Sequence, residues 1–134
     1  MPIVIDPSRD GLEKVLRDYQ IEALRNVWKH DGEGLTSRED YEAVNERLDG
    51  GRSVSRASII NFLNAMCDEG VLDFEEETCK GGMRRRYKKG MDEAMFKTYV
   101  ASTVLISLMR DFPEQTVEAI KINLDAESLK RLHD

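Results

Sequence analysis

Apolar side chains recur every three or four residues through the first third of the chain, which is the spacing of amphipathic helices. Asp6 suits an N-cap and Pro7 a first helical position, so the pattern predicts a helix from Pro7 to His30. Thr36 and Glu39 then have the spacing of a capping box, which predicts the start of a second helix. The apolar residues expected on the buried face of that helix are Tyr41, Val44 and Leu48.

A third helix is expected after the turn at 49–51, with Ser53 or Ser55 as its N-cap and Gly70 at its end. A helix with one apolar face packs that face on a core and presents the other face to solvent. The residues on the apolar face of this helix are Ile59, Leu63 and Met66.

The pattern then changes from helix to strand. Residues 71–75 alternate apolar and polar side chains, and residues 84–89 are expected to return as a second strand across a loop that contains Gly81 and Gly82. Basic residues without any acidic residue occupy the tip and the second strand of this hairpin, so one segment of the chain carries a local positive charge. They are Lys80, Arg84, Arg85, Arg86, Lys88 and Lys89.

The segment 92–112 is again helical by its spacing, but apolar residues lie on both of its sides. A domain of this size can cover only one side of such a helix, so we expect a second copy of the chain to cover the other. The alternative is an intramolecular cover by short helices at 114–132, which would leave no dimer. The residues expected at the dimer interface are Met95, Phe96, Tyr99, Val100, Val104, Ile106, Leu108 and Met109.

Pro113 is expected to end that helix, because proline cannot continue the helical hydrogen-bond pattern. A short helix follows, and Asp125 is expected to cap a final turn that carries Leu129 and Leu132. The apolar stripe of the short helix consists of Val117, Ile120 and Leu124.

The composition fits one compact domain with an appendage, since the chain has 134 residues of which 40% are hydrophobic. The net charge is −6 and the pI is about 5.0, which argues against indiscriminate binding to nucleic acid. Cys67, Cys79 and the two distant histidines supply neither a disulfide framework nor a metal site. We therefore expect a reducing compartment, no metal and no cofactor.

No signal peptide or membrane span is expected. The N-terminus has no basic flank and only a short apolar run, and the longest uncharged stretch, 98–109, is shorter than the roughly 20 residues that a span requires. The sequence therefore predicts a soluble, cytoplasmic protein that makes no contact with a membrane.

The predicted order of helix, helix, turn, helix and basic hairpin resembles that of the winged-helix transcriptional regulators. The resemblance is most detailed over residues 48–72, where Val54 lies in the turn. Over residues 12–89 the chain is most similar to the penicillinase-repressor (BlaI/MecI/CopY) group, and after them it shares only the layout of helices. The positions that match the family's core are Ile59, Leu63, Met66, Gly70 and Val71.

The resemblance implies a mainly α fold with a small β-hairpin, in which residues 1–90 form a winged helix-turn-helix and residues 91–134 form dimerisation helices. It implies a sequence-specific regulator of transcription that binds double-stranded DNA as a homodimer. Repression is the simplest output, because a bound dimer can occlude a promoter. Copper sensing is not implied, because the chain has no cysteine after Cys79. Proteolytic switching is not implied either, because the Asn61–Phe62 pair lies in the third helix rather than after the hairpin.

In a winged helix the third helix enters the major groove, and the residues of its first turns meet base edges. In this chain Arg56 is placed to pair with a guanine, and Asn61 or Asn64 with an adenine. Phosphate contacts fix the position of the protein without reading sequence. The residues expected to make them are Arg52, Ser53, Ser55 and Ser58.

Alternate residues of a strand share one face, so the basic strand has two rows. Either row can be the one that lies along the DNA backbone or minor groove, with Lys80 at the tip. The alternative is a solvated hairpin whose cations balance the acidic residues 75–77 across the strands. The two rows are Arg84, Arg86 and Lys88, and Arg85, Tyr87 and Lys89.

Two other classes of function compete with DNA binding. An enzyme is not expected, because the chain has no glycine-rich phosphate loop, nucleophile elbow or paired ligand motif. A protein-interaction adaptor is the stronger competitor, because winged helices also serve that purpose and the chain is acidic. An adaptor does not need a segment with six basic and no acidic residues, so the charge pattern favours DNA.

Overall fold

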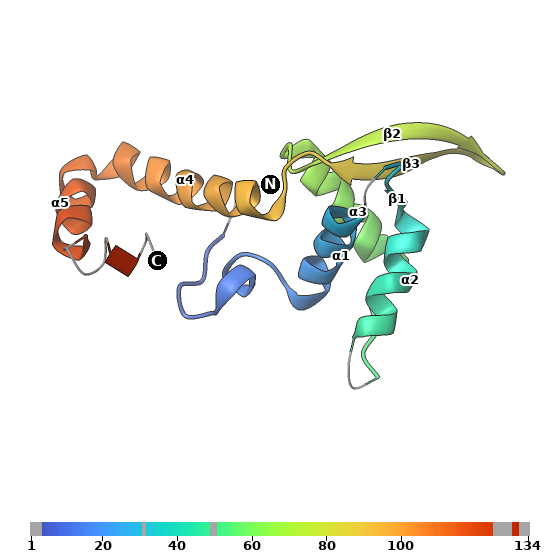
Figure 1. The fold of residues 1–134 in the computed structure, drawn as a ribbon, viewed down its shortest axis with the longest axis horizontal. Coiled ribbons are helices and arrows are strands. Elements are labelled where there is room, and N and C mark those ends of the chain that lie inside the picture. The colour runs from blue at the N-terminus through green and yellow to red at the C-terminus, as the bar shows by residue number, and fades with distance from the viewer. Residues whose placement is uncertain (1–3, 31, 49–50, 125–129, 132–134) are drawn as a thin grey trace. The chain divides into compact units, whose positions relative to one another are not determined.

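The computed structural model describes residues 4–30, 32–48, 51–124 and 130–131. Contacts within the chain divide it into two compact units, Met1–Phe96 and Lys97–Asp134 (Figure 1). The turn predicted at 49–51 lies partly outside the described residues. The predicted final turn at Asp125, with Leu129 and Leu132, lies outside them.

The described part of the first unit contains a short 3-10 helix, three complete α-helices and a three-stranded antiparallel sheet. Strand β3 lies in the middle of the sheet, with β1 on one side and β2 on the other. Figure 1 shows the β2–β3 hairpin extending beyond the helices that pack at its base. The elements are η1 (Gly11–Lys14), α1 (Asp18–Lys29), β1 (Leu35–Thr36), α2 (Ser37–Arg47), α3 (Arg56–Asp68), β2 (Leu72–Cys79) and β3 (Gly82–Lys89).

The predicted helix start at Pro7 is wrong. Asp6 does not cap a helix, because its Oδ1 accepts hydrogen bonds from the backbone N–H and the hydroxyl of Ser8, at 3.0 and 2.6 Å. Gly11 has a φ of +56°, outside the right-handed helical region, and only η1 forms before α1 begins. The apolar spacing nevertheless identified two residues of this stretch that are buried, Leu12 and Leu16.

Helices α2 and α3 begin at predicted caps. Thr36 and Glu39 form the capping box, with the Glu39 N–H donating to Thr36 Oγ1 at 3.2 Å and the Thr36 N–H donating to Glu39 Oε1 at 3.0 Å. Ser55, rather than Ser53, caps α3, and its Oγ accepts the backbone N–H three residues later at 3.1 Å. Gly70 has a φ of +78° and ends α3 in a Schellman turn, as its place in the sequence predicts.

Strand β1 was not predicted, because two residues are too few to show an alternating pattern. Leu35 pairs with Tyr87 and Thr36 with Arg86. Gly34 has a φ of +85°, and a Cβ at this position would collide with the carbonyl oxygen of Tyr87. The absence of a side chain at Gly34 therefore lets β1 approach β3, which ties the start of α2 to the hairpin.

The core of the first unit is built from the predicted apolar faces. Val44 of α2 is fully buried, whereas Tyr41 and Leu48, which were predicted to be buried with it, are half-buried. The prediction for α3 is confirmed, and Phe62 is buried beside the predicted residues. The largest fully buried apolar side chains are Leu24, Val27, Val44, Ile59, Leu63 and Val71.

One carboxylic acid lies inside this core. Asp40 is 0% exposed, and its Oδ1 accepts a hydrogen bond from Asn26 Nδ2 at 2.9 Å. Its Oδ2 has no hydrogen-bond partner among the described residues. Burial raises the pKa of Asp40 to about 7, because the charged form loses its hydration.

The remaining helices are α4 (Glu93–Asp111) and α5 (Pro113–Asn123), and most of α4 falls in the second unit. Asp92 caps α4 by accepting the N–H of Met95 at 2.8 Å, and Pro113 takes the first position of α5. Among the described residues of the second unit, only Thr116 is buried. These helices therefore form without building a core of the kind found in the first unit.

The predicted fold class, mainly α with a small β-hairpin, is confirmed by these elements. None of the described helices is long and apolar enough to cross a lipid bilayer. No three side chains of the kinds that ligate metals gather within the described part of the chain.

Candidate nucleic-acid interface

The N-terminal half of α3 presents polar side chains to solvent. Arg56 and Asn61 are exposed, and neither makes a side-chain hydrogen bond or ion pair with another described residue. The hydroxyl oxygens of Ser55 and Ser58 lie 2.9 Å apart in the first turn. A guanidinium and an amide are thus available beside a helix N-terminus, whose backbone N–H groups favour anions.

Asn64, predicted to meet DNA bases, contacts the β2–β3 hairpin, which we call the wing. Its Oδ1 accepts hydrogen bonds from the Tyr87 hydroxyl at 2.6 Å and from Arg85 Nη1 at 3.0 Å. The Arg85 guanidinium also lies 3.9 Å from the centre of the Phe74 ring. This network joins the middle of α3 to the wing face that carries Phe74, Arg85 and Tyr87, the inner face.

The opposite, outer face of the wing carries a ladder of ion pairs. Arg84 Nε lies 2.5 Å from Glu77 Oε1, and Arg86 Nε lies 2.7 Å from Glu77 Oε2. Arg86 Nη1 is also 3.4 Å from Glu39 Oε1. Hydrogen bonds from Arg86 and Arg84 lower the pKa of Glu77. This is the cross-strand charge balance expected for a solvated hairpin, so two of the predicted phosphate ligands already have anionic partners.

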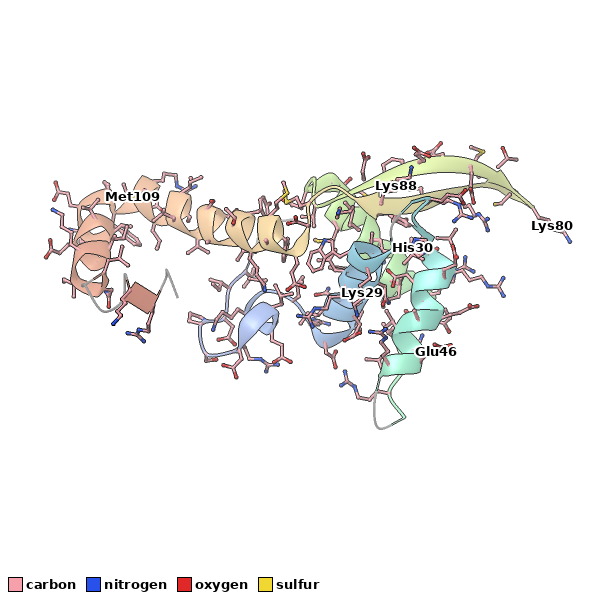
Figure 2. The ribbon with its side chains drawn as sticks, in the orientation of Figure 1. Lys29, His30, Glu46, Lys80, Lys88 and Met109 are labelled. Atoms are coloured by element: carbon pink, nitrogen blue, oxygen red, sulfur yellow. The ribbon has the colours of Figure 1, made fainter. Side chains whose placement is uncertain are left out.

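The other cations of the wing differ in their surroundings. Lys88 Nζ lies 2.7 Å from Glu75 Oε1, which extends the ladder on the outer face. Lys80 is exposed at the turn between the strands, and Figure 2 shows it at the far end of the wing. Lys80 and Lys89 make no side-chain hydrogen bond or ion pair with any residue in the described ranges. The charge at the tip and the charge at the end of β3 are therefore not balanced by a neighbouring carboxylate of the described residues.

An open groove of about 350 Å³ lies between α3 and the inner face of the wing. Basic side chains outnumber the one acidic side chain on its walls. The groove residues that bear on binding are Arg56, Ile60, Asn64, Glu76, Arg84 and Arg85.

Two predicted phosphate ligands precede α3. Arg52 Nη1 lies 2.5 Å from Asp18 Oδ2, and this bond lowers the pKa of Asp18. Ser53 is exposed. The structure therefore connects Arg52 to the start of α1, while the four residues 53–56 lead into the exposed turn of α3.

Most residues predicted for the dimer interface have accessible apolar surface. Phe96 differs, because it is 3% exposed within one chain and its ring centre lies 5.8 Å from that of Trp28. The Trp28 Nε1 donates to the Met91 carbonyl at 2.8 Å, which fixes this aromatic pair in the first unit. Phe96 therefore has little surface left for a second chain. The exposed members are Met95, Ile106, Leu108 and Met109, and the half-buried ones are Tyr99, Val100 and Val104.

The sequence did not identify one contact of the wing, and it gave another only as a general charge balance between the strands. The stacking of Arg85 on Phe74 requires the strand register, which pairs Phe74 with Tyr87. The ion pairs of Glu77 with Arg84 and Arg86 follow from the same register, which places Glu77 opposite Arg84. A two-residue turn at Lys80 and Gly81 fixes that register, so the signal was present in the sequence at the turn.

The described elements of the first unit have the order and sheet topology of a winged helix. No protein-family model and no curated protein sequence matches the chain. Among solved structures, the chain is similar to the crystal structure of a candidate transcriptional regulator from Thermoplasma acidophilum. The two share 18% identity with a TM-score of 0.47, over 75% of this chain and 90% of the other.

Proposed function

We propose that the protein is a sequence-specific transcriptional regulator that binds double-stranded DNA, acts in the cytoplasm as a homodimer and needs no cofactor. The observation that carries the proposal is Arg56 at the exposed start of α3, which has no side-chain partner among the described residues and lies beside a groove whose other wall is the basic wing. A guanidinium at this point of a recognition helix suits the N7 and O6 acceptors of guanine. Repression is the simplest output, because such a dimer can occlude a promoter.

The roles of the other residues follow from their surroundings. Asn61 is the second candidate base reader, because it is exposed in the N-terminal half of α3, five residues after Arg56. Ser53, Ser55 and Ser58 suit phosphate oxygens near the helix start. The wing supplies the remaining positive charge through Lys80, Arg84, Arg85, Arg86 and Lys88.

The homodimer is supported by the apolar surface of the second unit. Ile106 is 68% exposed although α5 is present, so the described part of α5 leaves this side of α4 uncovered. Helices α4 and α5 also line an apolar groove of about 460 Å³. Large exposed apolar patches mark interaction sites, and two-fold symmetry would match an operator with two half-sites. The apolar residues of the groove are Leu105, Leu108, Phe112, Ala119, Ile120 and Leu124.

The test is fluorescence anisotropy of the purified chain on random and promoter-derived duplexes across a salt series, with the mass in solution measured alongside. We expect a dimer with a steep salt dependence and a preference among duplexes. Arg84→Ala with Arg86→Ala should weaken binding to all duplexes alike, whereas Arg56→Ala should also relax the sequence preference. If both variants lose affinity equally and keep the preference, Arg56 does not read bases.

A winged-helix adaptor is the alternative function, and the ion-paired outer face of the wing favours it. Arg84, Arg86 and Lys88 all have carboxylate partners, and the whole chain carries a net charge of −6. An adaptor would show no binding to any duplex at low salt. That result would make the adaptor the leading function.

A further inference from the structure

We propose that the outer face of the wing is a masked binding surface for the DNA backbone, and that Glu77 is the residue that masks it. The inference rests on the proposed DNA binding and adds a competition to it. Arg84 and Arg86 would give all their donors to phosphate only once the Glu77 carboxylate has been displaced. Glu77 therefore sets how strongly the protein binds any duplex, independently of base sequence.

The geometry of the clamp supports this role. The two carboxylate oxygens of Glu77 each hold one guanidinium, Arg84 at 2.5 Å and Arg86 at 2.7 Å. A phosphodiester presents two anionic oxygens in a comparable way, so carboxylate and phosphate compete for the same donors. Both arginines approach through Nε, and each guanidinium has further N–H donors, so phosphate can begin to bind before the carboxylate has left.

The exchange is possible because the pairs are accessible. The side chain of Arg84 is 47% exposed, and that of Glu77 is 31% exposed. Ion pairs in such positions are individually weak, so a highly charged backbone can displace them. Arg86 is less accessible and has a second partner in Glu39, so we expect it to be released after Arg84.

Masking changes the salt dependence in a measurable way. A free cation that neutralises a phosphate releases one counterion and steepens the slope of log K against log salt by about 0.9. A cation that exchanges a carboxylate for a phosphate leaves an unpaired carboxylate beside the DNA. The repulsion between this carboxylate and the DNA offsets the increase in affinity and in salt slope. Glu77→Gln removes the competitor and keeps the shape of the side chain, so Arg84 becomes a free phosphate ligand and Arg86 keeps only Glu39 as an anionic partner.

The experiment measures anisotropy on random and promoter-derived duplexes at several salt concentrations, for wild type, Glu77→Gln and a charge-matched control. The control is Glu46→Gln, because Glu46 is exposed on α2 and makes no side-chain hydrogen bond or ion pair with another described residue (Figure 2). We expect Glu77→Gln to bind about tenfold more tightly at low salt, with a slope steeper by about one to two. The gain should be the same on both duplexes, and Glu46→Gln should show little of it.

A second set of variants separates masking from a general charge effect. In a chain that already carries Arg84→Ala and Arg86→Ala, Glu77→Gln should give no gain beyond that of Glu46→Gln, because no masked arginine remains. A full gain in that background would overturn the inference. So would equal salt slopes for wild type and Glu77→Gln, while the proposed DNA binding would stand. If neither chain binds any duplex at low salt, the proposed function fails as well.

Discussion

The two units of the chain contain helices of similar apolar content but bury them very differently. In the first unit Leu63 of α3 is 0% exposed, because α1, α2 and the sheet surround it. In the second unit Ile106 of α4 and Ile122 of α5 are 68% and 67% exposed. A helical pattern therefore predicts that a helix forms, but not whether the same chain covers it. The first unit has a core of its own, whereas the described helices of the second unit leave apolar surface exposed.

The largest expected effect comes from truncating one apolar residue in each unit. Leu63→Ala should lower the free energy of unfolding by about 3 kcal/mol, because it leaves a cavity in a packed core. Ile122→Ala should change it by less than about 0.5 kcal/mol, because that side chain is already exposed. Urea unfolding followed by circular dichroism reports on the helices of both units, and the fluorescence of Trp28, the single tryptophan, reports on the first unit alone. Equal losses in the two variants would mean that the units are not packed as differently as their exposure indicates.

Placing a charge on the exposed surface of the second unit should show whether that surface joins two chains. In a dimer formed through α4, Ile106→Glu buries a carboxylate and should raise the dimer dissociation constant about 100-fold. Met83→Glu is the matched control, because Met83 is 60% exposed on the wing of the first unit. Analytical ultracentrifugation should find a monomer for Ile106→Glu and a dimer for Met83→Glu. A wild-type chain that is already monomeric would assign the apolar surface to another partner.

A smaller effect concerns Asp40, a buried carboxylic acid in the core of the first unit. The pKa of Asp40 is raised to about 7 in the folded chain, well above the value of an unfolded aspartate. The protonated carboxyl of Asp40 therefore stabilises the fold fully below the pKa of aspartate in the unfolded chain. This stabilisation is lost as the pH rises through about 7. Between pH 5 and pH 8 the free energy of unfolding should fall by on the order of 2 kcal/mol.

Two asparagine substitutions isolate that contribution. Asp40→Asn stays neutral and should remove most of this decrease, so that the variant is more stable than wild type at pH 8. Asp111→Asn should leave the decrease intact, because Arg110 lowers the pKa of the exposed Asp111 and this group is ionised throughout the range. Urea unfolding of the three chains at pH 5, 6, 7 and 8 measures the difference. If the free energy of unfolding depends on pH equally in wild type and in Asp40→Asn, water reaches Oδ2 of Asp40.

The features that the sequence predicted well are those set by neighbouring residues. The capping box of Thr36 and Glu39, the Ser55 cap and the glycine end at Gly70 depend on contacts within one turn, and all three are confirmed. The helix start at Pro7 failed although its signals are equally local. Asp6 has a competing hydrogen-bond partner in Ser8, so a residue that suits a cap formed a turn instead.

The features that the sequence did not predict depend on pairing between distant segments. β1 exists because Gly34 allows a close approach to β3, a contact that no local pattern records. The candidate interface shows the same limit. The sequence found its basic residues, but only the strand register shows that Glu77 holds two of them and that Asn64 faces the wing.

Asn64 provides the smallest expected effect and the finest comparison between the units. Asn64→Ala removes the acceptor of two hydrogen bonds. Tyr87 is 3% exposed, and its hydroxyl loses this partner. The substitution should therefore lower the free energy of unfolding by about 1 kcal/mol. Asn123→Ala in α5 should cost less, because its amide donates only to the Ala119 carbonyl of an exposed turn. Urea unfolding monitored by circular dichroism compares the two. If Asn64 acts only by holding the wing in place, Asn64→Ala should lower the affinity for all duplexes by the same factor. Loss of affinity for one sequence alone would return Asn64 to the residues that read bases.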